Sequence, residues 1–275
     1  MTRGRLGFAD TKGRGDFDQL AAFAIENGFQ LIQISLDNPR YFPEKINEEK
    51  RRDVAKKLKD QDISLCFHGP SDLPLLNRHK KIRLAGVERL FEMIDMAIEM
   101  GAEYFILHPG RLAFYSSSTQ KVFFMEQRFP DKFGEIFTES FTRILDYVAG
   151  RLILCVENTH IIGGPLLEII VNLLHERQLF LVWDAAHVES LAEARRVQLL
   201  TFFQNNMRYV RLGHLHDIRD GRDHKGLGTG KLDVASYLEI FNTLSVDVVL
   251  EIFPEKELLK SMEYLRGLKL NAANM

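Results

Sequence analysis

Short apolar runs alternate with longer amphipathic stretches along this chain, and that alternation limits its fold more than any other feature. The short runs have the length of buried strands, and eight of them can be marked out: residues 5–9, 31–35, 64–68, 104–108, 152–157, 180–184, 209–214 and 248–252. The longer stretches repeat apolar residues at helical spacing: 17–27, 48–60, 82–100, 139–149, 165–176, 191–204, 234–243 and 257–268. Strands that alternate with helices predict βα units and a parallel sheet.

Residues able to bind a divalent metal lie at the ends of the predicted strands. They are His68 in FHG, His108 in LHPG, Glu157 in VENT, Asp184 and His187 in WDAAH, His214 and His216 in GHLHD, His224 in DHKGLGTG and Glu251 in VLEIF. A (β/α)8 barrel brings the carboxyl ends of its strands together at one rim. The two regularities together predict an α/β fold, a (β/α)8 TIM barrel, with a metal site at that rim.

The length of 275 residues is close to the usual size of one such barrel. No linker or low-complexity segment divides the sequence, so we expect a single domain over residues 1–275. One connection, residues 110–137, is rich in phenylalanine and too long for an ordinary βα loop. Phe123, Phe124 and Phe129 could close over a substrate as a lid, or the segment could be a loop with a short helix packed on the barrel.

The composition narrows the class of protein. Hydrophobic residues make up 45% of the chain and charged residues 27%, as in globular domains and unlike disordered or membrane proteins. A net charge of -2 and a pI near 6.5 provide no overall attraction for nucleic acid, although a local basic groove is compatible with them. The N-terminal MTRGRLGFAD lacks the apolar core of a signal peptide, and no run reaches the roughly 20 apolar residues of a membrane span. We therefore expect a cytoplasmic protein without a membrane partner.

The strand-end residues mix imidazoles with carboxylates. Mixed donors suit zinc or manganese, with cobalt, iron or magnesium as further candidates, whereas a purely oxygen set would favour magnesium or calcium. Any one of these residues alone would more often be a hydrogen-bonded core or surface group than a ligand. Cys66 and Cys155, each two residues before a proposed ligand, could line the site or be small reduced core residues.

The order of the motifs FHG, LHPG, VENT, DxxH, HLHD and HxxxGxG, followed by a glutamate at the end of the last strand, resembles a known superfamily. This superfamily joins the xylose isomerase-like sugar isomerases and epimerases with the endonuclease IV-type apurinic (AP) endonucleases of AP endonuclease family 2. The resemblance covers nearly the whole chain and implies a metal-binding TIM barrel. The motif order is specific for the superfamily and far less specific for the reaction.

The resemblance implies a core set of ligands. Glu157, Asp184, His214 and Glu251 match the four ligands that the sugar epimerases and the endonucleases share. His214 is preferred to His216 because the family histidine stands three residues before an acid, here Asp217.

Further ligands are implied by position. His68 and His108 match two ligands typical of the endonucleases, which would allow a second metal bridged by Glu157. His187 and His224 match a third-metal pair in the endonucleases or substrate-polarising groups in the isomerases.

Two departures from the endonuclease pattern argue against DNA repair. Arg222 stands where the third metal would take an aspartate, and the loop after His68 reads GPSDLPLL in place of bulky residues that enter DNA. Against these departures, the NPR stretch at residues 38–40 is similar to an endonuclease segment whose arginine reaches the DNA. Arg40 could equally hold a sugar phosphate.

These observations favour a metal-dependent isomerase or epimerase that acts on a sugar or sugar phosphate. The resemblance implies that Glu157 and Glu251 transfer a proton through an enediolate, as general acid and base, while His187 polarises a substrate oxygen. The expected substrate contacts are Arg40, His216, Arg219 and Arg222. The alternative is an AP endonuclease, a multi-metal phosphodiesterase with nucleic acid as its partner, and a third hypothesis is a barrel that binds a ligand without turnover.

Overall fold

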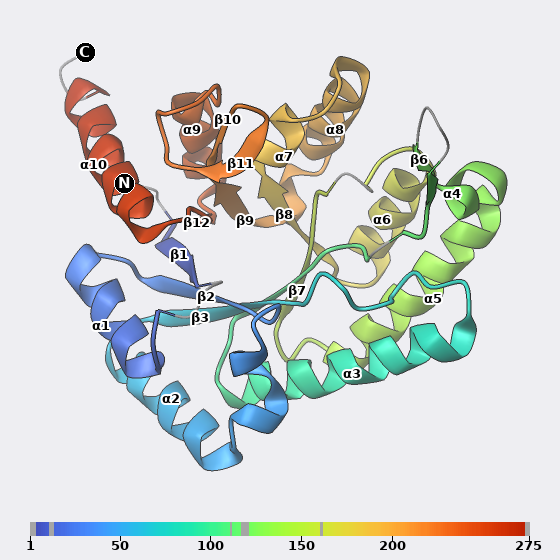
Figure 1. Ribbon diagram of the computed structural model, residues 1–275, viewed down its shortest axis with the longest axis horizontal. Coiled ribbons are helices and arrows are strands. Elements are labelled where there is room, and N and C mark those ends of the chain that lie inside the picture. The colour runs from blue at the N-terminus through green and yellow to red at the C-terminus, as the bar shows by residue number, and fades with distance from the viewer. Residues whose placement is uncertain (1–3, 11–13, 111, 117–120, 160–161, 273–275) are drawn as a thin grey trace.

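Figure 1 shows the computed structural model of the protein, which describes residues 4–10, 14–110, 112–116, 121–159 and 162–272. Eight parallel strands close into a barrel. In order round the barrel they are β1 (Leu6–Asp10), β2 (Leu31–Ser35), β3 (Ser64–His68), β4 (Tyr104–Leu107), β7 (Ile153–Glu157), β8 (Phe180–Asp184), β9 (Val210–Leu215) and β12 (Asp247–Leu250). The predicted strands are all present, and the predicted (β/α)8 barrel is confirmed.

Helices lie outside the strands and connect them (Figure 1). They are α1 (Phe17–Asn27), α2 (Glu48–Asp60), α3 (Lys80–Glu99), α5 (Pro130–Val148), α6 (Pro165–Glu176), α7 (Ala185–Glu189), α8 (Glu193–Asn205), α9 (Val234–Leu244) and α10 (Glu255–Ala272), with 3-10 turns at Pro39–Tyr41, Pro43–Lys45 and Met207–Tyr209. Local sequence fixes their ends. For example, the Asp16 side chain accepts hydrogen bonds from the backbone of Asp18 and Gln19 at the start of α1, and Gly28 ends it with a φ of 77°.

The phenylalanine-rich connection is shorter than expected because α5 begins within it. The predicted helix at residues 139–149 starts at Pro130 and ends at Val148. Proline fits the first turn of a helix, where no backbone N–H is needed, and Phe133, Ile136 and Phe137 are buried at helical spacing. The expected loop at residues 110–137 therefore ends where α5 starts.

The rest of this connection forms a small aromatic unit. It contains a hairpin of β5 (Tyr115–Ser116) and β6 (Lys121–Val122), followed by the short helix α4 (Phe124–Arg128). The ring of Phe124 lies 5.4 Å from that of Phe129 and 5.9 Å from that of Tyr115. The short helix of one of the two expected arrangements is therefore present, and closure over a substrate stays a prediction.

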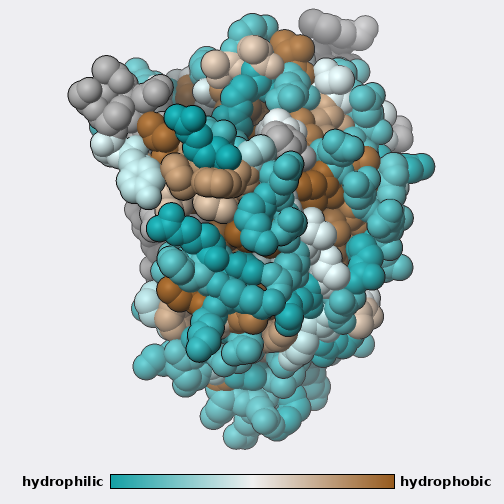
Figure 2. Space-filling view, turned by 90° about the vertical axis from the view of Figure 1, so that its right-hand side faces the viewer, coloured by the Kyte–Doolittle hydropathy of each residue, from teal (hydrophilic) through white to brown (hydrophobic). Residues whose placement is uncertain are grey.

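The face on the side of α4 and α5 is shown in Figure 2. Hydrophilic side chains cover most of it, and hydrophobic side chains form separate patches between them. The exposed large hydrophobic residues of the molecule include Phe114, Tyr115 and Phe129 of the aromatic unit. No helix among the described residues is long and apolar enough to span a membrane.

The interior of the barrel is filled by side chains from all of its strands. They are Ala9, Leu31, Cys66, Tyr104, Ile106, Cys155, Val182, Leu212 and Val249. Both cysteines are free and fully buried, and burial raises the pKa of their thiols. They are therefore protonated core residues, as one of the two sequence interpretations expected.

A charged cluster around Arg5 closes the amino end of the barrel. The guanidinium of Arg5 lies 2.6 Å from a carboxylate oxygen of Glu103 and 2.7 Å from one of Asp247. The hydroxyl of Tyr104 donates a hydrogen bond of 2.9 Å to Asp247. Hydrogen bonds to Glu103 and Asp247 outweigh the effect of burial and raise the pKa of Arg5. Each charge here has an opposite partner within the chain.

Candidate metal centre

The strands point the proposed ligands into one space above the barrel interior. Interior residues stand two positions before a ligand on six strands: Cys66 before His68, Ile106 before His108, Cys155 before Glu157, Val182 before Asp184, Leu212 before His214 and Val249 before Glu251. Because side chains alternate along a strand, each ligand faces the same way as the interior residue that precedes it. The ligands therefore form the layer that caps the apolar interior at the carboxyl end.

The four implied core ligands come together in the structure. Possible donor atoms of Glu157, Asp184, His214 and Glu251 all lie within 4.8 Å of one another, and the four residues are buried. The Nδ1 atom of His214 lies 3.5 Å from Glu157 Oε2, 3.6 Å from Glu251 Oε1 and 4.0 Å from Asp184 Oδ2. This nitrogen therefore faces all three carboxylates.

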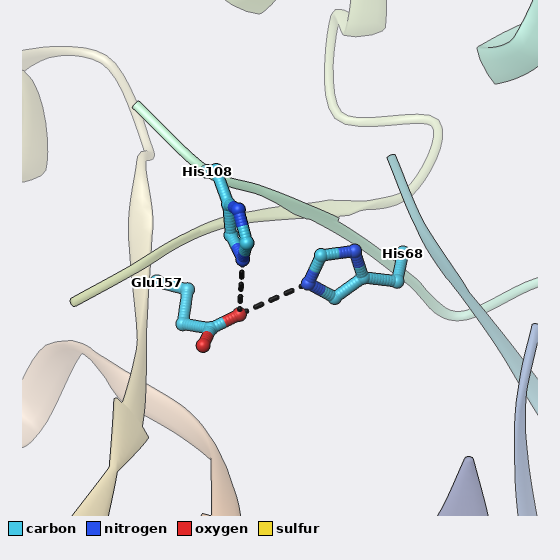
Figure 3. Close-up of side chains that lie close together, drawn as sticks. All are labelled: His68, His108 and Glu157. Atoms are coloured by element: carbon cyan, nitrogen blue, oxygen red, sulfur yellow. Dashed lines mark hydrogen bonds and ion pairs between the residues drawn. The ribbon is translucent and has the colours of Figure 1, made fainter. Parts of the chain in front are cut away.

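A second group shares Glu157 with the first (Figure 3). The Nε2 atom of His68 lies 3.0 Å from Glu157 Oε2, and that of His108 lies 3.3 Å from the same oxygen. The two imidazole rings meet edge to face, with centroids 4.7 Å apart. His68 and His108 thus lie where the resemblance implies, beside a carboxylate that could bridge two metals.

Backbone carbonyls fix the tautomers of three histidines. Nδ1 of His68 is bonded to the carbonyl of Gly69 at 3.0 Å, that of His187 to the carbonyl of Asn158 at 3.1 Å, and that of His224 to the carbonyl of Glu251 at 2.9 Å. A carbonyl can only accept, so each Nδ1 carries the proton and donates it. Each Nε2 is thereby left available to a metal or a substrate, the usual arrangement for a ligating histidine.

The carboxylates of the core group are charged. Burial raises the pKa of Glu157, but the nearby imidazoles of His214 and His108 outweigh burial and hold it well below its usual value. The pKa values of Asp184 and Glu251 are lowered in the same way, by His187 and His214 respectively. Buried negative charges of this density require positive partners.

The histidines supply part of that positive charge. Burial lowers the pKa of His68, but its hydrogen bond to Glu157 and the charge of that residue raise the pKa to about 9. Burial opposes a similar rise for His187, where the charges of Asp184 and Glu157 raise the pKa to about 11. Protons on these rings therefore occupy the space between the carboxylates, and a divalent cation could replace them.

Two buried atoms at the centre have the chemistry of metal ligands. Glu157 Oε1 and His214 Nδ1 are buried and have no hydrogen-bond partner among the described residues. His187 Nδ1 lies 3.2 Å from Glu157 Oε1, but its hydrogen bond is to the carbonyl of Asn158. Buried polar atoms without a partner are rare in proteins, and a bound ion is one of the usual reasons for them. The mixed oxygen and nitrogen donors suit a divalent transition metal such as zinc or manganese.

The proposed third pair, His187 and His224, lies on either side of His216. The ring centroids are 5.8 Å and 4.3 Å from that of His216, and His216 completes both candidate donor groups that contain these residues. Asp223 approaches within 3.9 Å of His187 Nε2, whereas Arg222 is exposed on β11 (Arg222–Lys225). The nearest replacement for the absent aspartate is thus one residue further along the chain.

His216 has no free ring nitrogen. Its Nδ1 accepts a hydrogen bond of 2.9 Å from the backbone N–H of His224, so its Nε2 carries the proton and donates to Asp184 at 3.0 Å. The side chain is fully buried. This geometry favours a supporting role that ties Asp184 to β11, and the predicted contact of His216 with substrate is untested.

The predicted substrate-binding arginines lie at the surface. Arg40 is exposed and donates to the carbonyl of Gly15, while Arg219, on β10 (Asp217–Arg219), lies 3.7 Å from Glu257. Among the described residues, neither they nor Arg222 pairs with a carboxylate of the metal centre. Their contacts with substrate therefore stay predictions.

Sequence reasoning missed two supporting residues. Gln33 is buried between Glu251 and His214 and bonds to both. The side-chain amide of Asn158 donates to the backbone carbonyl of Asp184 and accepts from its backbone N–H. A signal for Gln33 was present, because it is the one amide within the apolar run LIQIS. Helix α7, which carries His187 directly after β8, was also not expected, since the predicted helix began at residue 191.

Comparison with known proteins places the chain among related barrels. A protein named "Probable endonuclease 4" from Mycobacterium marinum is 31% identical over 96 residues, and the match covers 35% of this chain and 36% of that protein. The chain thus matches about a third of the length of this relative.

Two solved structures share the whole fold. A D-tagatose 3-epimerase-like protein superposes with a TM-score of 0.76 at 16% identity, covering 98% of this chain and 99% of the other. An L-ribulose 3-epimerase superposes with a TM-score of 0.73 at 15% identity, covering 98% and 96% of the two chains. The family described as "Xylose isomerase-like TIM barrel" matches residues 21–268. This chain belongs to the xylose isomerase-like TIM barrel family.

Proposed function

We propose that this protein is a divalent-metal-dependent isomerase or epimerase of a small sugar or sugar phosphate. The observation that carries the proposal is the position of two buried carboxylates, those of Glu157 and Glu251, at 3.5 Å and 3.6 Å from the same nitrogen of His214. They come from strands on different sides of the rim, since β8 and β9 separate β7 from β12. Such a pair can act on a substrate carbon from two directions.

The residues divide the reaction between them. A divalent metal held by Glu157, Asp184, His214 and Glu251 would supply Lewis-acid polarisation of a substrate carbonyl. The lowered pKa values of Glu157 and Glu251 mean that both carboxylates are ionised, which a group must be to accept a proton from the carbon beside that carbonyl. One carboxylate removes the proton, and the other, after taking a proton from water, returns it to the opposite face of the same carbon, which inverts that carbon. In an isomerase the proton would be returned to the former carbonyl carbon, while a hydroxyl proton moves to complete the new carbonyl.

His187 fits the role of a polarising acid. Its Nδ1 is bonded to a backbone carbonyl, its side chain is partly exposed, and its pKa is raised to about 11. The ring can therefore donate from Nε2 to a substrate oxygen on which negative charge develops. Solved barrels named as sugar epimerases share the fold, which supports a sugar as substrate.

An apurinic endonuclease is the second candidate. The second histidine pair, His68 and His108, beside a shared Glu157 fits a two-metal phosphodiesterase, and one matching relative is named as an endonuclease. Arg222 and the displacement of Asp223 weaken the third site that this reaction would use. We therefore rank DNA cleavage below sugar isomerisation, and nucleic acid is a partner only under this candidate.

The two candidates can be separated with the purified protein and Mn²⁺. Ketoses and ketose phosphates are incubated with it in D₂O, and an abasic DNA duplex is incubated in parallel. We expect deuterium to enter the carbon beside the carbonyl of at least one sugar, with the duplex left intact. Incision of the duplex without deuterium incorporation into any sugar would overturn the proposal in favour of the endonuclease.

A further inference from the structure

An amide in the middle of β2 lies beneath the candidate metal centre. Gln33 is 1% exposed, pairs in register with Ala9 and Cys66 on the neighbouring strands, and faces the barrel interior. Burying an amide in such an apolar space is unfavourable unless its hydrogen bonds are made. Gln33 therefore needs partners, and it finds them among the ligands.

Both ends of the amide bond to a proposed ligand. Its Nε2 lies 2.5 Å from Oε1 of Glu251, and its Oε1 lies 2.9 Å from Nε2 of His214. A charged carboxylate can only accept, so the amino group of Gln33 must face Glu251 and its carbonyl must face His214. The carbonyl in turn requires a proton on Nε2 of His214.

That proton decides which nitrogen of His214 serves the metal. With Nε2 protonated and bonded to Gln33, Nδ1 is the remaining nitrogen, and it is the buried atom that faces the carboxylates without a hydrogen-bond partner among the described residues. His68, His187 and His224 present the opposite nitrogen, since backbone carbonyls hold their Nδ1 atoms. His214 differs from them because a side chain, which a substitution can remove, holds its ring.

We propose that Gln33 is a positioning residue that selects the Nδ1 of His214 as ligand and orients the carboxylate of Glu251 beside it. One neutral side chain thereby orients two of the four core ligands, and both ligands follow β2 at a long distance in the sequence. This role rests on the proposed function, because it presumes that a metal binds at the centre.

Three variants test the role. Gln33→Met keeps the length and burial of the side chain and removes both hydrogen bonds. Gln33→Glu keeps an acceptor for His214 and replaces the amide donor to Glu251 with a carboxyl group. Tyr104→Phe is the matched control, since it removes a buried hydrogen bond to Asp247 in the same barrel interior, at the opposite end.

Two measurements on these proteins test the role of Gln33 without an activity assay. Isothermal titration with Zn²⁺ should give a dissociation constant about 10–100-fold weaker for Gln33→Met than for the natural protein, the usual effect of losing a partner of a ligand. Tyr104→Phe should remain within about twofold of the natural protein, because the hydrogen bond it loses is at the amino end. Nitrogen-15 spectra of the zinc-loaded histidines should show a slowly exchanging Nε2–H on His214 in the natural protein and in Gln33→Glu, and its loss in Gln33→Met.

The outcomes separate the two proposals. If the natural protein binds zinc and Gln33→Met binds it equally well with the Nε2–H of His214 unchanged, the role of Gln33 is wrong and the proposed function stands. Loss of the Nε2–H signal in Gln33→Glu as well as Gln33→Met would also contradict the role, since an acceptor remains there. If the natural protein binds neither Zn²⁺ nor Mn²⁺, the proposed function fails and this role fails with it. The Gln33→Glu spectrum decides the matter if Gln33→Met does not fold.

Discussion

Each end of the barrel contains a cluster of acidic side chains, and the two clusters differ in whether their polar atoms have partners within the chain. At the amino end, Asp247 and Glu103 share the guanidinium of Arg5, and each charge has a partner. At the carboxyl end, the ion pairs of Glu157, Asp184 and Glu251 among the described residues are with histidines alone, and Glu157 Oε1 and His214 Nδ1 remain without a hydrogen bond. The first cluster is complete within the chain, whereas the donor groups of the second could hold a cation, as proposed above.

The difference shows how a buried charge can indicate function. A buried ion pair with all of its hydrogen bonds serves the folded state, and breaking it leaves an uncompensated charge. Buried ionisable groups with strongly shifted pKa values gather at sites that bind a metal or perform chemistry. The same barrel therefore contains a charge cluster that fits a structural role and one that we propose is functional, with an apolar interior between them.

The largest expected effect is on turnover at the carboxyl end. Glu251→Gln should reduce deuterium incorporation into the sugar substrate at saturating Mn²⁺ by about 10³-fold or more, because the amide cannot accept the proton. The metal-free protein should unfold at a lower temperature, because the lowered pKa of Glu251 means that the fold stabilises its charged form. Full turnover by this variant would exclude Glu251 as an acid or base.

A matched pair of substitutions should separate the two ends. Asp247→Asn should lower the free energy of unfolding by about 2 kcal/mol and leave metal affinity unchanged, because it weakens the hydrogen bonds to Arg5, which keeps Glu103 as a partner. Asp184→Asn should weaken metal binding strongly, because it removes a proposed ligand, whereas Asp247→Asn should not. Urea unfolding and titration with Mn²⁺ measure the two quantities, and equal behaviour of the two variants would remove the distinction between the ends.

The stability of the metal-free protein should fall as the pH rises above neutrality. The folded protein raises the pKa of His68 from 6.5 to about 9, so folding binds a proton more tightly than the unfolded chain does. This stabilisation, on the order of 3 kcal/mol, is complete below pH 6.5 and is lost as the pH rises through 9. His187 extends the same trend towards a pH of about 11.

Bound metal should reverse that trend. Protons on His68 and His187 compete with the cation, so metal affinity should increase over the same pH range. Thermal unfolding between pH 6.5 and 9, with and without Zn²⁺, measures both slopes. A metal-free protein whose stability rises over this range would show that these imidazoles are not protonated in the folded state.

The smallest expected effect concerns the surface. Arg222→Ala should change the free energy of unfolding by less than about 0.5 kcal/mol, because the side chain is exposed. If Arg222 binds a substrate phosphate, KM for a phosphorylated sugar should rise while KM for the unphosphorylated sugar stays the same. An equal change for both sugars would contradict a phosphate contact.

The sequence predicts the frame of this molecule well because two periodicities determine it. Because side chains alternate along a strand, His214, two residues after the interior Leu212, faces the same way as Leu212. Closure of the barrel then brings the end of β9, which carries His214, close to the end of β7, which carries Glu157. No pattern along the chain predicts that Gln33 donates a hydrogen bond to Glu251, because the two residues are 218 positions apart in the sequence. The role of His216 is hidden for the same reason, because its tautomer depends on a backbone N–H of the folded hairpin.

The start of α5 illustrates a different limit. Phe133 and Phe137 have helical spacing, but they follow a run of aromatics and polar residues that also fits a loop. Burial against the rest of the barrel settles which of the two forms, and that packing is a property of the fold and not of the local segment.

Metal binding by the natural protein tests the central claim most directly. The protein is stripped of metal with a chelator, dialysed, and titrated with Zn²⁺ and Mn²⁺ in a calorimeter beside Asp184→Asn. We predict saturable binding of at least one ion per chain with release of protons, lost or strongly weakened in the variant. Absence of binding in the natural protein, or equal binding by Asp184→Asn, would contradict the assignment of this cluster as a metal centre.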